Sequence, residues 1–182
     1  FAPLPSLKLG LSDSTSGLSM GETAEILARE FGISRERQDI FSLRSHRKAV
    51  QSREKLREEI ASVSLSSGSK TCVQDDNGPR EDQDFAALAN LKPAFARRTG
   101  TVTAGNASQI SDGACALLLM DAEKAKALGY EILGTLRDYV YVGLEPSHMG
   151  LGPVFAIDRL LRRNSLTLKD IELWEINEAF AA

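Results

Sequence analysis

A carboxamide and its small neighbours occupy a position where chemistry could occur. Asn177 opens the sequence NEAF directly after the apolar run 171–176, which predicts a buried strand ending at this residue. Open α/β sheets place their ligand crevices beyond the carboxyl ends of such strands. A carboxamide there can fix a water or donate to a developing oxyanion. The alternative is a strand-to-helix turn that the asparagine only caps.

Two further segments are rich in small residues. Residues 100–108, GTVTAGNAS, hold two glycines and three hydroxyl side chains, which would let a ligand approach the backbone closely. A plain structural turn is the alternative for this segment. The sequence MGLGP at 149–153 predicts a turn at a helix start, where Met149 either lines an apolar pocket or packs in the core.

Neither cysteine has the surroundings of a nucleophile. Cys115 lies in an apolar run, where burial would raise the pKa of its thiol, and Cys72 has no histidine nearby in the sequence. We expect His46 to be solvated on a charged helix, whereas His148 could face a cleft. No cysteine or histidine stands at ligand spacing from another, so we expect no metal site.

Composition sets wider bounds on the protein. The chain has 182 residues, 42% of them hydrophobic and 26% charged, which suits one ordinary domain or two small ones. A net charge of −3 argues against a polybasic nucleic-acid binder. The longest apolar run, 114–120, is far shorter than the roughly 20 residues that cross a bilayer. We expect a soluble protein from a reducing compartment, and a piece of something longer.

Capping residues and apolar periodicity predict the helices that position these segments. A capping box at Ser19–Glu22 opens one helix, and Ser34 opens a second that should run to about Glu59. Further helices are expected over 85–91, from Asp121 to Gly129, and from Gly152 to Asn164. A second capping box lies at 167–170. The first half of the chain is therefore mainly helical.

The expected strands fall mostly in the second half. Residues 61–65, 101–104, 132–142 and 171–176 have strand patterns, and 114–120 reads as a buried strand or helix. A polar loop at 66–70 and a turn at 75–79 separate the first of these from the rest. Strands that alternate with helices favour a layered α/β fold, with a boundary near residue 110.

Seven ordered motifs together resemble the thiolase family over nearly the whole chain. They are SMGETAE (19–25), ISRERQD (33–39), LKPAF (91–95), GTVTAGNAS (100–108), SDGA (111–114), MGLGP (149–153) and NEAFAA (177–182). The resemblance implies an α/β fold of two αβαβα halves with a mainly helical inserted loop domain. On it, residues 1–110 are the CoA-binding loop domain, 111–131 the end of the N-terminal half, and 132–182 the start of the C-terminal half.

The resemblance also implies the function and its residues. Thiolases cleave 3-ketoacyl-CoA with CoA to acyl-CoA and acetyl-CoA by a Claisen mechanism. Asn177 would hold the water that helps form the oxyanion hole. The residues implied around CoA are Ser108, Ala104, Phe95, Arg80, Met20 and Leu11. Met149, Ala179 and Phe180 would wall the acyl pocket. CoA enters as substrate, and no separate cofactor or metal is implied.

The resemblance leaves some alternatives open. In thiolases the acylated cysteine, the histidine that activates it and the second cysteine all lie outside the matched segment, so this chain alone should be inactive. A biosynthetic acetoacetyl-CoA thiolase and a non-catalytic CoA-binding or scaffold fragment are the alternative functions. A role in fatty acid β-oxidation, a homo-oligomer or hetero-complex, and a cytoplasmic location (mitochondrial or peroxisomal in a eukaryote) are the remaining expectations.

Overall fold

The computed structural model describes residues 10–64 and 72–182, which form two compact units. Unit 1 comprises the chain up to Gln109 together with Pro146–His148 and Asn177–Ala182, and unit 2 comprises Ile110–Glu145 and Met149–Ile176. The predicted loop at 66–70 lies outside the described residues. None of the helices in the described ranges is long and apolar enough to span a membrane.

Unit 1 is built on two helices whose starts are fixed by local hydrogen bonds. Helix α2 spans Met20–Glu30 and begins at the predicted capping box, in which Ser19 and Glu22 bond each other's backbone N–H groups. Helix α3 spans Arg35–Gln51, and the hydroxyl of Ser34 accepts from the N–H of Arg37. Gly32 joins the two helices with a φ of 61°, a conformation that costs glycine little. Both predicted helix starts are confirmed.

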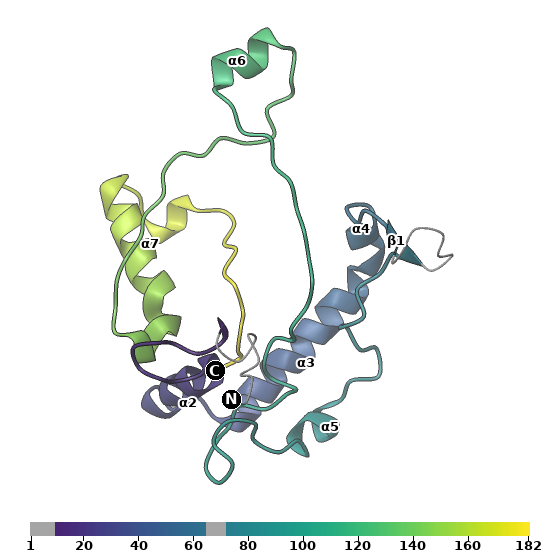
Figure 1. Cartoon of the computed structure of the whole chain (residues 1–182), viewed down its shortest axis with the longest axis vertical. Coiled ribbons are helices and arrows are strands. Elements are labelled where there is room, and N and C mark those ends of the chain that lie inside the picture. Colours follow the sequence, from purple (N-terminus) through teal and green to yellow (C-terminus); the bar gives the residue numbers. More distant parts are fainter. Residues whose placement is uncertain (1–9, 65–71) are drawn as a thin grey trace, which may run out of the picture. The chain divides into compact units, whose positions relative to one another are not determined.

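The predicted second helix is interrupted. It stops at Gln51, and a separate helix, α4, covers Arg53–Arg57 (Figure 1). Ser52 leaves helical geometry with φ −95° and ψ 3°. Helix α4 buries no residue, so no packing offsets the low helix propensity of this serine. Helix α5, Phe85–Ala89, confirms the predicted short helix and packs against α3.

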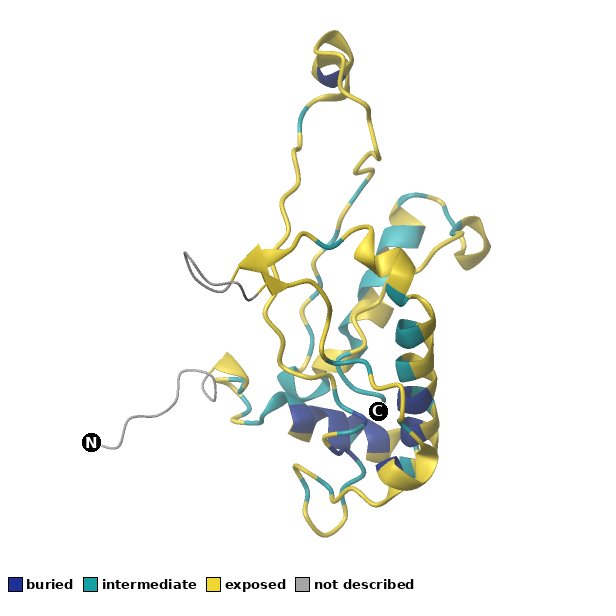
Figure 2. Ribbon diagram, turned by 90° about the vertical axis from the view of Figure 1, so that its right-hand side faces the viewer, coloured by how far each residue is buried: buried dark blue, intermediate teal, exposed yellow. Residues whose placement is uncertain are grey.

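The core of unit 1 lies between these helices and the segment at 101–106. Its apolar members come from α2, α3, α5 and residue 102, and they are Ala24, Leu27, Ala28, Leu43, Leu88 and Val102. The buried residues, dark blue in Figure 2, concentrate on the helices. Polar residues are buried among them, which bears on the site below.

The predicted strands of unit 1 are shorter than expected. Strand β1, Val63–Ser64, pairs antiparallel with β2, Cys72–Val73, and both strands are exposed. The expected strand at 101–104 is reduced to a single bridge between Pro93 and Thr103. Instead of a neighbouring strand, the N–H groups of Thr101 and Val102 bond to Glu25 of α2, and that of Thr103 bonds to the side chain of Asn106.

Unit 2 contains helices without the expected strands. Helices α6, Ala122–Ala127, and α7, Gly152–Arg163, confirm the predictions, as does the capping box of the 3₁₀ helix η2, Leu168–Asp170. The 3₁₀ helix η1 covers Pro146–Leu151 across the unit boundary.

The segments 114–120, 132–142 and 171–176 are irregular and largely exposed, contrary to the prediction. Leu117 is 81% exposed and Leu133 is 92% exposed. A strand needs a neighbour for its backbone hydrogen bonds, and the described residues offer these segments none.

Candidate functional site

Segment 100–108 of unit 1 is held by buried polar side chains. Glu25 of α2 is 5% exposed, and its carboxylate accepts hydrogen bonds from the N–H groups of Thr101 and Val102 at 2.9 to 3.0 Å. A buried carboxylate is stable only when it is well bonded. Glu25 therefore attaches the start of the segment to α2.

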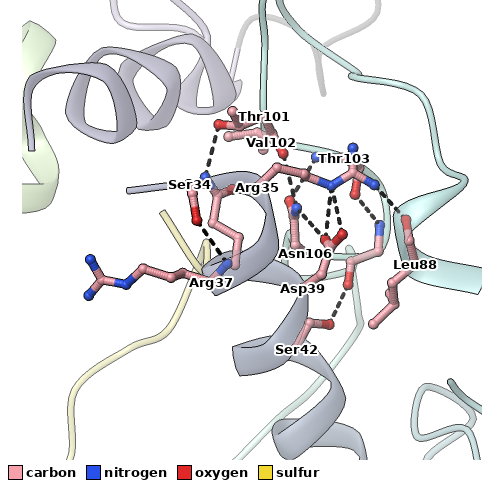
Figure 3. A network of polar contacts seen from close by, with 12 residues as sticks. Ser34, Arg35, Arg37, Asp39, Ser42, Leu88, Thr101, Val102, Thr103 and Asn106 are labelled. Atoms are coloured by element: carbon pink, nitrogen blue, oxygen red, sulfur yellow. Dashed lines mark hydrogen bonds and ion pairs between the residues drawn. The ribbon is translucent and has the colours of Figure 1, made fainter. Parts of the chain in front are cut away.

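Asp39 of α3 is the centre of a second set of contacts (Figure 3). Its carboxylate is 1% exposed and pairs with Arg35 at 2.8 Å. It also accepts a hydrogen bond from the side-chain amide of Asn106 at 3.0 Å. The carbonyl oxygen of Asn106 in turn accepts from the N–H of Thr103 at 2.7 Å. This chain of bonds fixes the middle of the segment on α3.

Two other residues of α3 complete the attachment. Gln38 donates to the hydroxyl of Thr101 at 2.9 Å, and Ser42 donates to the carbonyl of Gly105. Gln38 and Asp39 are almost fully buried, so these contacts are shielded from water. Segment 100–108 consequently has a set conformation although it is neither helix nor strand.

The end of segment 100–108 pairs with the last residues of the chain. The N–H of Ser108 donates to the carbonyl of Ala179 at 2.7 Å, and the N–H of Ala181 donates to the carbonyl of Asn106 at 2.9 Å. Ala107 and Phe180 form the bridge between them. The structure thus brings together Ser108, Ala179 and Phe180, three residues that the sequence analysis selected for CoA and the acyl pocket.

Phe95 and the start of α2 adjoin this pairing. The rings of Phe95 and Phe180 meet edge to face with centroids 6.2 Å apart. The Phe95 ring lies so close to Gly21 that a Cβ there would be 2.1 Å from it. Met20 precedes Gly21 and donates its N–H to the carbonyl of Leu11 at 3.1 Å. Leu11, Met20 and Phe95 therefore border the same region of unit 1.

The remaining predicted residues are placed as follows. Ala104 is exposed in the turn after Thr103, and Asn177 is exposed at the start of the 177–182 segment. Met149 is 36% exposed and belongs to unit 2. Ala179 and Phe180 belong to unit 1, so the predicted place of Met149 in the acyl pocket stays a prediction.

Arg80 follows the turn at 75–79, and this part of the chain is bonded to residues of α3 and α4. Its N–H donates to Nδ1 of His46 at 3.2 Å. Partial burial and the charge of Arg80 lower the pKa of His46 from its ordinary value, so this ring is neutral and can accept at neutral pH. The expectation that His46 is merely solvated was wrong, because the 75–81 turn folds back onto it.

The other histidine has two polar partners, and one cysteine differs from expectation. His148 contacts Ser147 at 2.8 Å and the carboxylate of Glu30 at 2.9 Å, so its ring is bonded at both nitrogens. Cys115 is exposed, contrary to the predicted burial, because its segment has no strand partner; Cys72 is exposed as well. Within the described ranges, no group of three or more acidic, histidine or cysteine side chains could hold a metal ion.

Sequence reasoning missed the residues that hold segment 100–108. Glu25, Asp39 and Asn106 belong to the quoted motifs, but no role was predicted for any of them. One signal was present in the sequence. Ser42 lies three residues after Asp39 and the buried Leu43 lies four residues after it, which places both on the same side of the helix as Asp39. Polar residues on an apolar helix face indicate a buried polar network.

Comparison with known proteins places this geometry in a family. The family model described as "Thiolase, N-terminal domain" matches residues 5–123, and "Thiolase, C-terminal domain" matches residues 130–182. The chain belongs to the thiolase family. It is 46% identical over 173 residues to the human peroxisomal 3-ketoacyl-CoA thiolase, a match that covers 91% of this chain and 41% of that protein.

Solved thiolase structures agree with this assignment. The dimeric peroxisomal thiolase of Saccharomyces cerevisiae matches with a TM-score of 0.85 and 41% identity, covering 90% of this chain and 42% of that one. Human mitochondrial 3-ketoacyl-CoA thiolase in complex with CoA matches with a TM-score of 0.84 and 35% identity, covering 97% and 44%. The predicted thiolase-like α/β fold class is confirmed. The chain spans less than half the length of these thiolases.

Proposed function

We propose that the protein containing this chain is a 3-ketoacyl-CoA thiolase, an acyltransferase that cleaves 3-ketoacyl-CoA with CoA to acyl-CoA and acetyl-CoA. One observation carries the proposal. Ser108 is paired through its backbone with Ala179, and Phe180 packs against Phe95. Family resemblance assigns these residues to the pantetheine and the acyl group. Two motifs about 70 residues apart in the sequence thus meet in one place.

The chemistry of these residues suits an acyl-pantetheine ligand. The exposed hydroxyl of Ser108 donates to the carbonyl of Gln109 at 3.2 Å and can exchange this bond for one with a pantetheine amide. Phe95, 38% exposed, packs against Phe180, the residue after the Ala179 that Ser108 bonds. An amide needs a hydrogen-bond partner and a methylene chain needs apolar walls. Ser108 can supply the hydrogen bond, and Phe95 can supply an apolar wall.

Asn177 is proposed to act on the thioester carbonyl. It stands two residues before Ala179, whose carbonyl is fixed by Ser108. A carboxamide at this position can orient a water toward the negative charge that develops on the carbonyl oxygen. Loss of one such donor typically slows a reaction by about 10²–10³-fold. The nucleophile and its base are proposed to lie outside this segment, as they do in the family.

The partners and location are proposed on the same basis. We infer that CoA thioesters are substrates and that no further cofactor takes part. A homo-oligomer is supported by the yeast thiolase, which is described as dimeric. A role in fatty acid β-oxidation and a peroxisomal location in a eukaryote are supported by the name of the human relative. A bacterial counterpart would be cytoplasmic.

Replacement of Asn177 by alanine in the complete protein tests the proposed function. We expect kcat for acetoacetyl-CoA thiolysis to fall about 10²-fold or more, while the Kd of CoA barely changes, because the carboxamide acts on charge that is present only in the transition state. Asn90→Ala, which removes an exposed carboxamide at the end of α5, is the matched control and should leave kcat unchanged. A normal kcat in Asn177→Ala would make Asn177 a simple turn residue.

A further inference from the structure

The turn that carries Arg80 has an acidic residue on each side of it, and both are paired with arginines. Asp75 accepts from the Nε of Arg57 at 2.6 Å and from the Nη2 of the same residue at 3.3 Å. Glu81, the residue directly after Arg80, pairs with Arg53. Arg53 is the first residue of α4, directly after the break at Ser52, and Arg57 is the last residue of α4. One helical turn therefore neutralises both carboxylates.

Residues of this turn and of the two helices also line one hollow, among them Ala49, Leu56, Asp75 and Pro79. At the far end of the turn, His46 accepts the N–H of Arg80 at 3.2 Å. Helix α3 thus holds the backbone of Arg80 through His46. Helix α4 holds the two carboxylates, Glu81 through Arg53 and Asp75 through Arg57.

The guanidinium of Arg80 is exposed and, among the residues that the structure describes, pairs with no carboxylate. A released Glu81 would compete with any anionic ligand for Arg80, because two opposite charges on adjacent exposed side chains attract even in water. The ion pair to Arg53 removes that competitor.

We propose that Arg53 and Arg57 are positioning residues that hold Glu81 and Asp75 away from Arg80 and so leave its guanidinium for a phosphate of the ligand. The phosphate is that of CoA, and in this respect the inference rests on the proposed function. Arg53 and Arg57 do not touch the ligand in this arrangement. They act by withholding two carboxylates from the cation that does.

Isothermal titration of CoA into the complete protein tests the inference. In Arg53→Ala, Glu81 is released, and we expect the Kd of CoA to rise about 2- to 5-fold, the size of one exposed ion pair. The double variant Arg53→Ala, Glu81→Gln should regain the wild-type Kd, because the carboxylate released by the loss of Arg53 is no longer present. Arg53→Lys keeps the pair and should also stay at the wild-type value. A loss of folding alone would not be repaired by Glu81→Gln.

Two further variants separate the inference from the proposed function. Arg37→Ala removes one positive charge from the other end of α3 and should leave the Kd unchanged, which excludes an effect of net charge. Arg80→Ala should weaken CoA binding, and less so at high salt. An unchanged Kd in Arg80→Ala would overturn the proposed CoA site at this residue, and with it the inference.

If Arg80→Ala weakens CoA binding, Arg53→Ala and the double variant Arg53→Ala, Glu81→Gln test whether Arg53 acts by holding Glu81. A Kd that stays normal in Arg53→Ala, or one that rises and is not restored by Glu81→Gln, would refute the inference while leaving the proposed function intact.

Discussion

Replacement of Asn106 by alanine should loosen the segment that carries Ser108. Asn106 is 3% exposed, and its side chain makes three hydrogen bonds. In Asn106→Ala the N–H of Thr103, which is fully buried, loses its acceptor, and the Asp39 carboxylate loses a donor. Each buried group left without a partner costs about 1–3 kcal/mol. The Thr103 N–H alone therefore costs about 1–3 kcal/mol, a sizeable part of the stability of a typical domain, whereas Asp39 keeps its ion pair with Arg35.

Hydrogen exchange of the complete protein measures this loss locally. The amides of Thr101 and Val102 report on the segment, because their acceptor, Glu25, is unchanged in the variant. A loss of 2 kcal/mol corresponds to about 30-fold faster exchange when exchange occurs through opening of the segment. Asn90→Ala removes an exposed carboxamide and should change exchange little. Protection within about threefold of wild type in Asn106→Ala would refute the role assigned to the network.

Asn106→Asp gives the same reasoning a pH dependence. The new carboxylate would lie about 3 Å from that of Asp39, where the amide now donates. Two such buried charges repel, so one of the pair has a pKa above its unfolded value in the folded state. The destabilisation is then full above that raised pKa and shrinks as the pH falls through it. Protection factors, in which the intrinsic pH dependence of exchange is divided out, should therefore rise on acidification in Asn106→Asp, and they should not rise in Asn106→Ala.

Three other changes act on α2 and its N-cap. Gly21→Ala places a Cβ 2.1 Å from the ring of Phe95, so Tm should fall and the Kd of CoA should rise, whereas Gly134→Ala, with nothing within 4 Å, should change neither; an unchanged Kd with lowered Tm would remove Phe95 from the proposed site. Ser19→Ala breaks the capping box and should cost about 0.5–2 kcal/mol by denaturant unfolding. Hydrogen bonds from Ser19 lower the pKa of Glu22 below 4.5, so this contribution is present above pH 4.5 and is lost as the pH falls through the lowered value. Glu22→Gln should flatten that part of the pH dependence of Tm, and a profile identical to wild type would contradict the capping role.

The site was only partly predictable for a physical reason. Family motifs named Ser108, Phe95 and Phe180, but their meeting depends on a hydrogen bond between residues 71 apart, Ser108 and Ala179. Nothing local to either motif specifies that bridge. The same holds for His46, whose partner Arg80 lies 34 positions away. Isolated residues in a helix pattern indicate which face they occupy, and they do not indicate which distant backbone groups will reach them.

The amino-acid sequence by itself determined where the helices begin. Ser19, Ser34, Asp121 and Thr167 each cap a helix through bonds within three residues, so chain order alone sets them. Tertiary structure decided which polar groups are buried and whether apolar runs become strands. The segment 114–120 has a strand's composition and remains irregular among the described residues, because strand hydrogen bonds are made to another segment. Helix hydrogen bonds close within the element, and strand and network bonds do not.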